Sequence, residues 1–122
     1  MTTSAAADNV SPMDFNEYQD KAVSTAIYPG KGGVYGLAYV GLGLGEAGEV
    51  QGKIKKVLRD DAGELTEQAR LSIAKEAGDL LWYLAALADE IGVPLEIIAT
   101  INLNKLGDRA ARGVLGGSGD ER

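Results

Sequence analysis

Four stretches of the chain repeat apolar residues at the three- and four-residue spacing of an amphipathic helix. The first begins at Asp14, a typical N-cap residue with Glu17 three positions on, and is expected to run to about Ala26, before Pro29-Gly30. The other three are expected over 35–59, 66–91 and 94–112. There is no hairpin signal, internal repeat or βαβ alternation. We therefore predict an all-α fold, a compact bundle of about four helices.

The two ends of the chain lack this pattern. Residues 1–12 are small and polar and predict a flexible N-terminal arm, and residues 114–122 form a glycine-rich tail. Between them, residues 13–113 are expected to form one helical domain, since 122 residues fit a single domain.

The second predicted helix is unusually rich in glycine. Interior glycines cost roughly 1 kcal/mol each relative to alanine, so propensity alone would not predict a helix here. We expect close packing against another helix, or access for a ligand, to compensate, and a kink would be compatible with this composition. The glycines are Gly36, Gly41, Gly43, Gly45, Gly48 and Gly52.

Two pairs of acidic residues interrupt apolar helix faces. Glu46 and Glu49 are three positions apart, as are Glu76 and Asp79, so each pair shares one face. Carboxylates at a helix–helix seam repel one another and lose water, at a cost on the order of several kcal/mol unless something pairs with them. Divalent cations would offset that repulsion if the two helices pack together. The apolar neighbours on these faces are Tyr39, Leu42, Val50 and Val57 for the first pair, and Leu80, Tyr83 and Leu87 for the second.

The amino-acid composition limits the kinds of catalytic or metal site that the chain can form. The chain has no cysteine and no histidine, which excludes a Cys/His zinc site, a cysteine nucleophile and a Ser-His-Asp triad. Oxygen ligands favour magnesium, manganese or calcium. The net charge of −6 argues against binding of duplex nucleic acid. Without a long apolar span or a secretory signal, we expect a cytoplasmic protein that does not enter a membrane.

Ordinary surface ion pairs are the competing explanation for the acidic motifs. Glu49 and Lys53 have i,i+4 spacing, as do Lys75 and Asp79, so such pairs would account for half of the motif. For a single E-x-x-E this explanation is the commoner one. Two such motifs on the apolar faces of consecutive helices favour a metal cluster.

The same segments resemble a known family, the MazG-like nucleotide pyrophosphohydrolases of the all-α NTP pyrophosphatase superfamily. The family signature is E-x-x-E followed, after a variable interval, by E-x-x-D, and 26 residues separate Glu49 from Glu76 here. The resemblance extends from about Phe15 to Arg122. It is carried by Gly45-Glu46-Ala47-Gly48-Glu49-Val50, Lys55-Lys56, Glu76-Ala77-Gly78-Asp79-Leu80-Leu81-Trp82-Tyr83-Leu84, Asn102-Leu103-Asn104-Lys105-Leu106 and the segment 117–122.

The resemblance implies that Glu46, Glu49, Glu76 and Asp79 form the catalytic centre and coordinate magnesium, with manganese as a substitute. The implied substrate is a nucleoside triphosphate, cleaved between the α and β phosphates to give a monophosphate and pyrophosphate. Control of nucleotide pools, or removal of unwanted nucleotides, would be the corresponding role. Which carboxylate acts as base stays open.

Further residues are candidates for substrate binding. Lys53 lies one turn after Glu49, and Lys105 and Arg109 lie one turn apart on the last predicted helix, where Asn102 and Lys105 match the family's Asn-x-x-Lys pattern. Solvated lysines or ordinary ion pairs are the alternative. Trp82 could stack on a base, a contact worth ~1–3 kcal/mol, although core packing is the commoner fate of such a residue.

A di-iron carboxylate bundle needs Glu-x-x-His motifs, and the chain has no histidine. A helical oligomerisation or regulatory module that kept the fold without catalysis remains the alternative. Short helices rich in glycine and alanine, with a broad apolar side around Trp82, also predict self-association, as a homodimer or a dimer of dimers, with the active site near the interface.

Overall fold

The computed structural model describes residues 12–113 and 116. Every regular element within them is a helix, which confirms the all-α prediction. In chain order these are α2 (Phe15–Val23), α3 (Val34–Gly43), the 3-10 helix η1 (Leu44–Glu46), α4 (Ala47–Asp60), α5 (Glu67–Ile91) and α6 (Leu95–Ala111). The predicted N-terminal arm and glycine-rich tail lie outside the described residues, except for residues 12 and 116.

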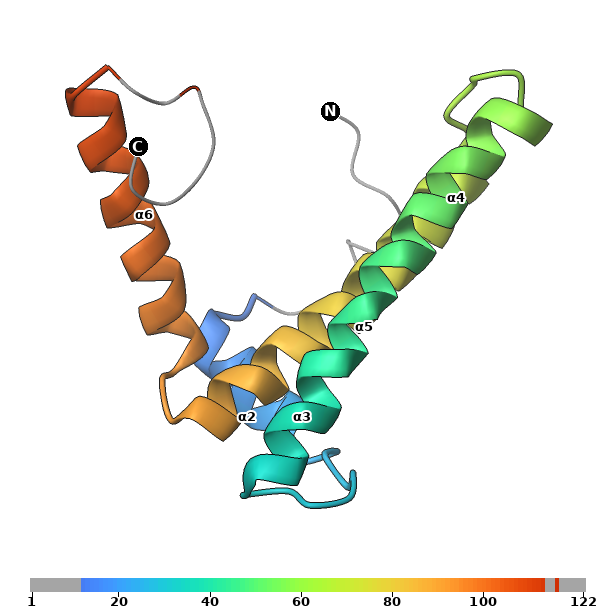
Figure 1. The fold of residues 1–122 in the computed structure, drawn as a ribbon. Coiled ribbons are helices and arrows are strands. Elements are labelled where there is room, and N and C mark those ends of the chain that lie inside the picture. The colour runs from blue at the N-terminus through green and yellow to red at the C-terminus, as the bar shows by residue number, and fades with distance from the viewer. Residues whose placement is uncertain (1–11, 114–115, 117–122) are drawn as a thin grey trace.

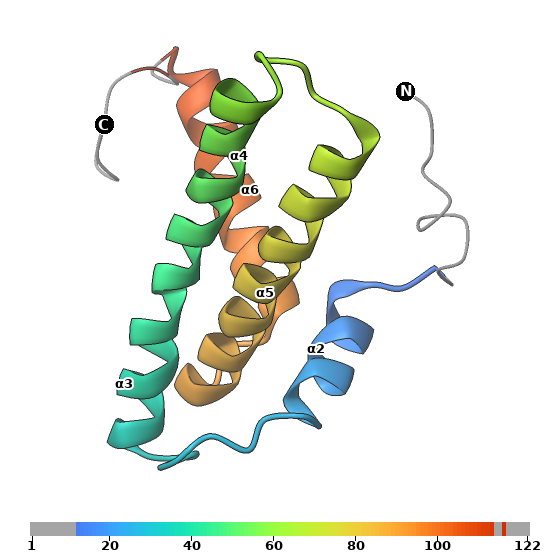
Figure 2. The ribbon, with the colours of Figure 1, turned by 90° about the vertical axis from the view of Figure 1, so that its right-hand side faces the viewer.

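The helices form two arms that diverge from a common base (Figure 1). One arm is an antiparallel pair in which the continuous path of α3, η1 and α4 packs along α5 (Figure 2). The other arm is α6, which packs on α2 and α5 at the base and, among the described helices, on no other. The short helix α2 lies beside α5 and completes the base.

The first helix begins as predicted and ends slightly earlier. The Asp14 side chain accepts a hydrogen bond from the Glu17 N–H, so Asp14 is the expected N-cap. The helix ends at Val23, because the hydroxyls of Ser24 and Thr25 donate to backbone carbonyls three residues earlier and favour a turn.

The predicted helix 35–59 is interrupted by η1. A 3-10 turn advances each residue by about 120°, against about 100° in an α-helix, so three residues rotate α3 by roughly 60° relative to α4. The predicted apolar face is therefore not continuous. Val57 is buried, but Leu42 is 82% exposed and Tyr39 is 43% exposed.

The third and fourth predicted helices are close to the observed ones. The Thr66 side chain caps α5 by accepting from the Ala69 N–H. Gly92 ends α5 in the left-handed conformation, with φ of 70°, and the chain turns into α6. Pro94 is the N-cap residue of α6, and Gln19 of α2 accepts the Leu95 N–H at 2.8 Å. This bond fixes the base of the α6 arm to α2.

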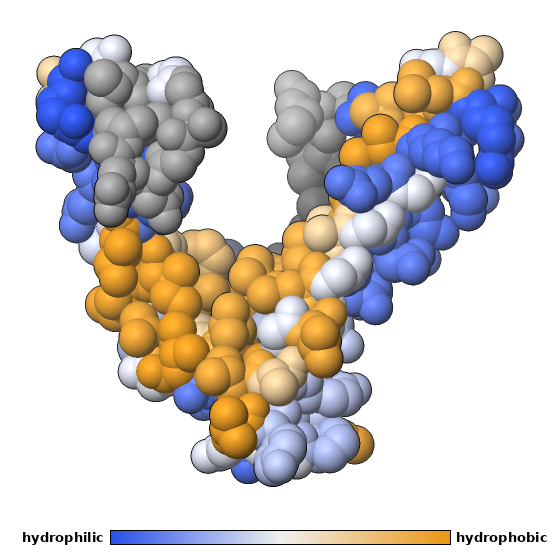
Figure 3. Space-filling view, in the orientation of Figure 1, coloured by the Kyte–Doolittle hydropathy of each residue, from blue (hydrophilic) through white to orange (hydrophobic). Residues whose placement is uncertain are grey.

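The core of the single chain is small and consists mainly of alanine. The buried hydrophobic residues are Ala22, Ala26, Tyr28, Val40, Val57, Ala85, Ala86, Ala88 and Leu95. Many larger apolar side chains on the described helices stay exposed, among them Leu58 (72%), Ile101 (55%) and Leu103 (67%). Figure 3 shows hydrophobic surface over α6 near the base and along the inner side of the other arm. None of the described helices has the length and apolar content needed to cross a membrane.

Candidate metal centre

Three of the four predicted metal ligands meet between the two antiparallel segments. Glu46 ends η1, and Glu76 and Asp79 lie one turn apart on α5. One carboxylate oxygen from each lies within 4.8 Å of the others. Glu46 and Glu76 are half-buried and Asp79 is exposed, so the group is accessible from solvent.

Glu49 is not a member of this group. It lies in the first turn of α4, where its side chain is exposed. Glu46 is the last residue of η1, whereas Glu49 belongs to α4, and only the oxygen of Glu46 comes within 4.8 Å of those of Glu76 and Asp79. Glu49 remains a predicted fourth ligand, one turn from the group.

The competing explanation by surface ion pairs is not supported within the described residues. The ion pairs found there are Lys21–Glu17, Arg59–Asp60 and Arg112–Asp108. Lysine or arginine thus does not neutralise Glu46, Glu76 or Asp79 in this part of the chain. Three close carboxylates without a cationic side chain fit a hard divalent cation, which takes oxygen ligands and keeps positions for water and phosphate.

A pocket of about 270 Å³ adjoins the carboxylates. Its lining residues are Glu46, Asp79, Trp82 and Tyr83, so acidic groups and aromatic rings share one space. A larger pocket of about 630 Å³ lies between α2 and the α5–α6 turn, away from the acidic group.

Trp82 belongs both to the core and to this pocket. Its indole N–H donates to the Thr25 hydroxyl at 2.9 Å and to the Ala22 carbonyl at 3.2 Å, which ties α5 to α2. The ring packs against buried residues of both core clusters. The core interpretation is therefore confirmed, while a role in stacking on a base stays a prediction.

Tyr83 lies beside Trp82, with the two rings perpendicular and their centroids 5.1 Å apart. Burial raises the pKa of Tyr83, and the nearby Tyr39, Glu46 and Asp79 raise it further. Burial likewise raises the pKa of Tyr18, with Asp79 adding to the effect. Tyr18 of α2 thus lies near the acidic group. The sequence gives no signal for this position, because the helical pattern of α2 does not show on which side of α5 the helix packs.

Lys53 lies further along α4, beyond the acidic group. It lines a separate pocket of about 390 Å³ together with Lys56, Thr66 and Ser72. The α4–α5 pair therefore carries, in order from the base, aromatic rings, carboxylates and lysines.

The other predicted substrate-binding residues lie on the second arm. Asn102 is exposed, Lys105 is half-buried and Arg109 is only 4% exposed. Among the described residues α6 does not contact α4, so a single chain does not bring these three side chains to the acidic group.

The region that holds the acidic group is similar to known proteins. The model of a family described as MazG nucleotide pyrophosphohydrolase domain matches residues 37–113, which include the acidic group. The Gene 37 protein of Mycobacterium phage L5 is 48% identical over 114 residues, covering 90% of this chain and 100% of that protein. No solved structure matches the chain.

Proposed function

Because the chain belongs to the MazG nucleotide pyrophosphohydrolase family, we propose that it is a magnesium-dependent nucleoside triphosphate pyrophosphohydrolase. It cleaves between the α and β phosphates and releases a nucleoside monophosphate and pyrophosphate. The observation that carries the proposal is the group of three carboxylates, whose oxygens lie within 4.8 Å of one another beside an open pocket. Control of nucleotide pools, or removal of unwanted nucleotides, is the proposed role.

In this proposal Glu46, Glu76 and Asp79 hold the metal ion, with Glu49 as a fourth ligand or as the base. When bound, Mg²⁺, or Mn²⁺ in its place, makes water more acidic and neutralises charge on the phosphates. Glu46 and Glu76 are half-buried, so these two carboxylates lose part of their hydration on folding, which a bound cation would offset. Lys53, one turn beyond Glu49 and in the neighbouring pocket, attracts the leaving phosphates in this proposal.

We also propose that the working form is a homodimer or a dimer of dimers with the active site near the interface. Asn102, Lys105 and Arg109 lie on α6, which diverges from α4 of the same chain. The acidic group of a second copy is the place where Asn102 and Lys105 can meet a triphosphate, whereas Arg109 is 4% exposed within its own chain and would have to change its side-chain conformation to do so. The exposed apolar residues on both arms support such an association.

The test is pyrophosphate release from a panel of ribo- and deoxyribonucleoside triphosphates, with and without Mg²⁺. Glu46→Gln, Glu76→Gln and Asp79→Asn keep the side-chain shape and remove the charge. We expect each to lower kcat/KM on the order of 100-fold or more, since each removes a metal ligand.

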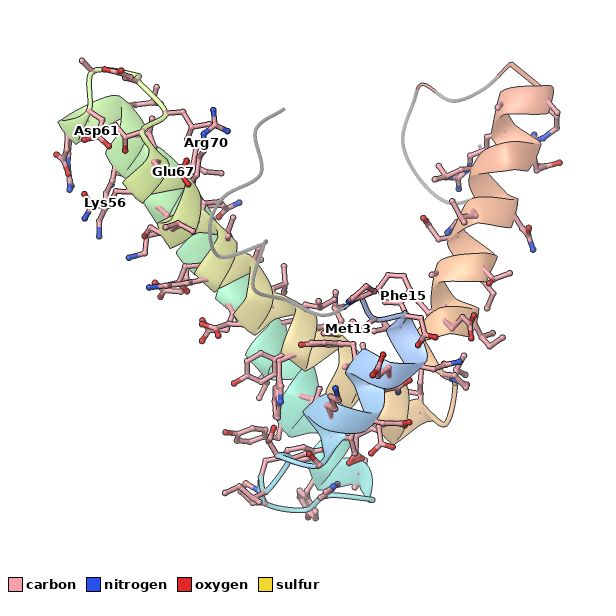
Figure 4. The ribbon with its side chains drawn as sticks, turned by 180° about the vertical axis from the view of Figure 1, so that it is seen from behind. Met13, Phe15, Lys56, Asp61, Glu67 and Arg70 are labelled. Carbon is pink, nitrogen blue, oxygen red and sulfur yellow. The ribbon has the colours of Figure 1, made fainter. Side chains whose placement is uncertain are left out.

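Glu67→Gln is the matched control. Glu67 is an exposed acid in the first turn of the same helix, and Figure 4 shows it at the far end of the α4–α5 arm. We expect activity to be unchanged by this substitution. If the wild type releases no pyrophosphate from any nucleotide and Mg²⁺ leaves its melting temperature unchanged, the chain is a non-catalytic helical module.

A further inference from the structure

The first turn of α6 is capped by a side chain of another helix. The first N–H groups of an α-helix have no partner within the helix, and the side chain of the N-cap residue often supplies one. The N-cap residue of α6 is Pro94, which makes no side-chain hydrogen bond to the helix. The side-chain oxygen of Gln19, on α2, accepts the Leu95 N–H at 2.8 Å instead. The cap of α6 therefore depends on the position of α2.

Gln19 joins three helices at this point. Its side-chain amide donates to the Ala85 carbonyl of α5 at 3.4 Å, while its oxygen holds α6. Leu95 is 6% exposed and belongs to the same buried cluster as Ala85. Loss of the Gln19 oxygen would leave the Leu95 N–H without its acceptor beside this cluster, which is a costly place for an unpaired donor.

A second side chain of α2 holds the next residue of α6. Asn16 donates a hydrogen bond to the Glu96 carboxylate. Asn16 and Gln19 are three positions apart and share one face of α2. Two neighbouring side chains of α2 thus hold two successive residues of α6, and this arrangement constrains the direction of the helix as well as its starting point.

Little else constrains the direction of α6. Among the described helices it packs only on α2 and α5, at the base, and the rest of the arm diverges from them (Figure 1). The packing of Leu95 in the core anchors the helix, but apolar contacts have no preferred direction. Beside the connecting residues 92–94 lies the pocket of about 630 Å³, so side chains do not fill that side of the turn.

A small change of direction at the base becomes a large displacement along the arm. Lys105 is ten residues after Leu95, so the rise per residue places it roughly 15 Å from the cap. Over that length, a tilt of about 10° moves Lys105 by roughly 2.6 Å. Misplacement of a binding group by about 1 Å can already cost about 100-fold in rate. The residues of α6 therefore need a fixed direction of the helix to act on a substrate.

We propose that Gln19 is a positioning residue: it caps α6 from α2 and thereby fixes the direction of the arm, so that Asn102 and Lys105 reach the triphosphate at the acidic group of a second copy. This inference rests on the proposed function and on the shared site proposed with it. Gln19 itself does not contact the substrate in this proposal.

The direction of α6 can be measured without any reaction. The chain has no cysteine, so Lys55→Cys and Asn104→Cys introduce two unique sites for spin labels on exposed residues of α4 and α6. Electron–electron double resonance then gives the distance between the arms, with excess unlabelled protein to suppress distances between chains. We expect a narrow distribution for Gln19 and a broad one for Gln19→Met, which keeps the side-chain length and removes the acceptor.

Two further substitutions separate the acceptor from the rest of the side chain. Gln19→Glu keeps an oxygen for the Leu95 N–H, and a negative charge suits a helix N-terminus, so we expect it to restore the narrow distribution. Asn16→Ala removes only the bond to Glu96, at an exposed position, and should broaden the distribution less. Gln51→Met, at an exposed glutamine of α4, is the matched control and should leave it unchanged.

Kinetics test the link to the substrate. Well below the melting temperature of each variant, we expect Gln19→Met to raise KM on the order of 10- to 100-fold, and Gln19→Glu to stay near the wild type. The affinity for Mn²⁺, read from its electron paramagnetic resonance signal, should not change, because the clustered carboxylates lie on η1 and α5. A substitution that merely lowered stability would leave KM unchanged at these temperatures.

The outcomes separate this inference from the proposed function. A distance distribution that Gln19→Met leaves narrow, or a broad one with unchanged KM, overturns the role of Gln19 and leaves the proposed reaction standing. Weaker binding of Mn²⁺ by Gln19→Met also overturns it, since the acidic group itself would then be disturbed. A distribution that broadens as expected in a chain that hydrolyses no nucleotide supports the capping of α6 by Gln19 and contradicts the proposed reaction.

Discussion

A single carboxylate holds the loop between α2 and α3 against α5. Glu90 accepts hydrogen bonds from the Tyr28 hydroxyl at 2.9 Å and from the Gly32 N–H at 2.7 Å. Tyr28 is 8% exposed and stacks on Tyr39 with centroids 5.3 Å apart. Burial raises the pKa of Tyr28 to about 12, with the hydrogen bond to Glu90 and the charges of Glu90 and Asp89 adding to the effect. Individual contacts of this kind set the position of the aromatic rings beside the acidic group.

The raised pKa of Tyr28 predicts a loss of stability at alkaline pH. Because the folded chain binds this proton more tightly than the unfolded chain, the stabilisation is complete below about pH 10 and is lost as pH rises towards 12. Tyr28→Phe should cost about 1.5–3 kcal/mol at neutral pH, through the lost bond to a charged group. It should also show a smaller fall in melting temperature above pH 10 than the wild type.

Thermal unfolding across this pH range measures both effects. Tyr35→Phe, at the exposed Tyr35, controls for the removal of a tyrosine hydroxyl and should follow the wild type throughout. Equal alkaline losses for Tyr28→Phe and the wild type would contradict the assignment to Tyr28.

At the scale of elements, the helices and their first residues followed from the sequence. Asp14 is the cap that the pattern predicted, because capping depends on local spacing alone. The 3-10 segment at 44–46 could not be predicted in this way. Gly43 and Gly45 are compatible with a kink, but four other glycines in the same predicted helix are too, and the tight approach of Gly43 to Tyr83 is a tertiary contact.

The acidic group was predictable in part. Helical spacing correctly placed Glu76 and Asp79 together, since both lie in one unbroken helix. The prediction that Glu46 lies near this pair was also correct, because the apolar faces of the two predicted helices indicated that they pack against each other. Glu49 lies outside the group, and helical spacing alone could not show this, because it gives the shared face of a pair and not the distance of each side chain from α5.

Substitutions at two glycines of α3 test how closely α3 packs against α5. Gly43→Ala places a methyl group within 2.0 Å of the Tyr83 ring and should destabilise the fold by about 1–3 kcal/mol. Gly41→Ala meets nothing within 4 Å and should stabilise the helix by up to about 1 kcal/mol. Denaturant unfolding of the two variants measures the difference. Similar stabilities would mean that α3 and α5 do not approach as closely as described.

At the scale of the whole molecule, the two arms leave apolar surface on both sides of the opening between them (Figure 3). The core of the described residues is mostly alanine, while larger residues such as Ile97, Ile101 and Leu106 on α6 are 38–55% exposed. A chain that buries small side chains and exposes large ones gains little hydrophobic stabilisation by itself. A second copy would cover this surface.

Ile101→Glu tests the association. Ile101 is 55% exposed, and a charge there would have to lose water in an interface formed by α6. We expect sedimentation to show an oligomer for the wild type and a shift towards the monomer, with loss of activity, for this variant. Thr100→Glu, at the adjacent exposed residue, is the control and should sediment as the wild type. An active wild-type monomer would contradict both the association and the shared site.

The three clustered carboxylates all come from one helical hairpin, η1–α4 followed by α5. Their separation along the chain is therefore short compared with sites assembled from distant segments, and the entropy lost in bringing them together is that of closing a single loop. Such a site can form early in folding, before α6 has docked. A divalent ion present during refolding would then act as a template, accelerating closure of the hairpin as well as stabilising the finished protein.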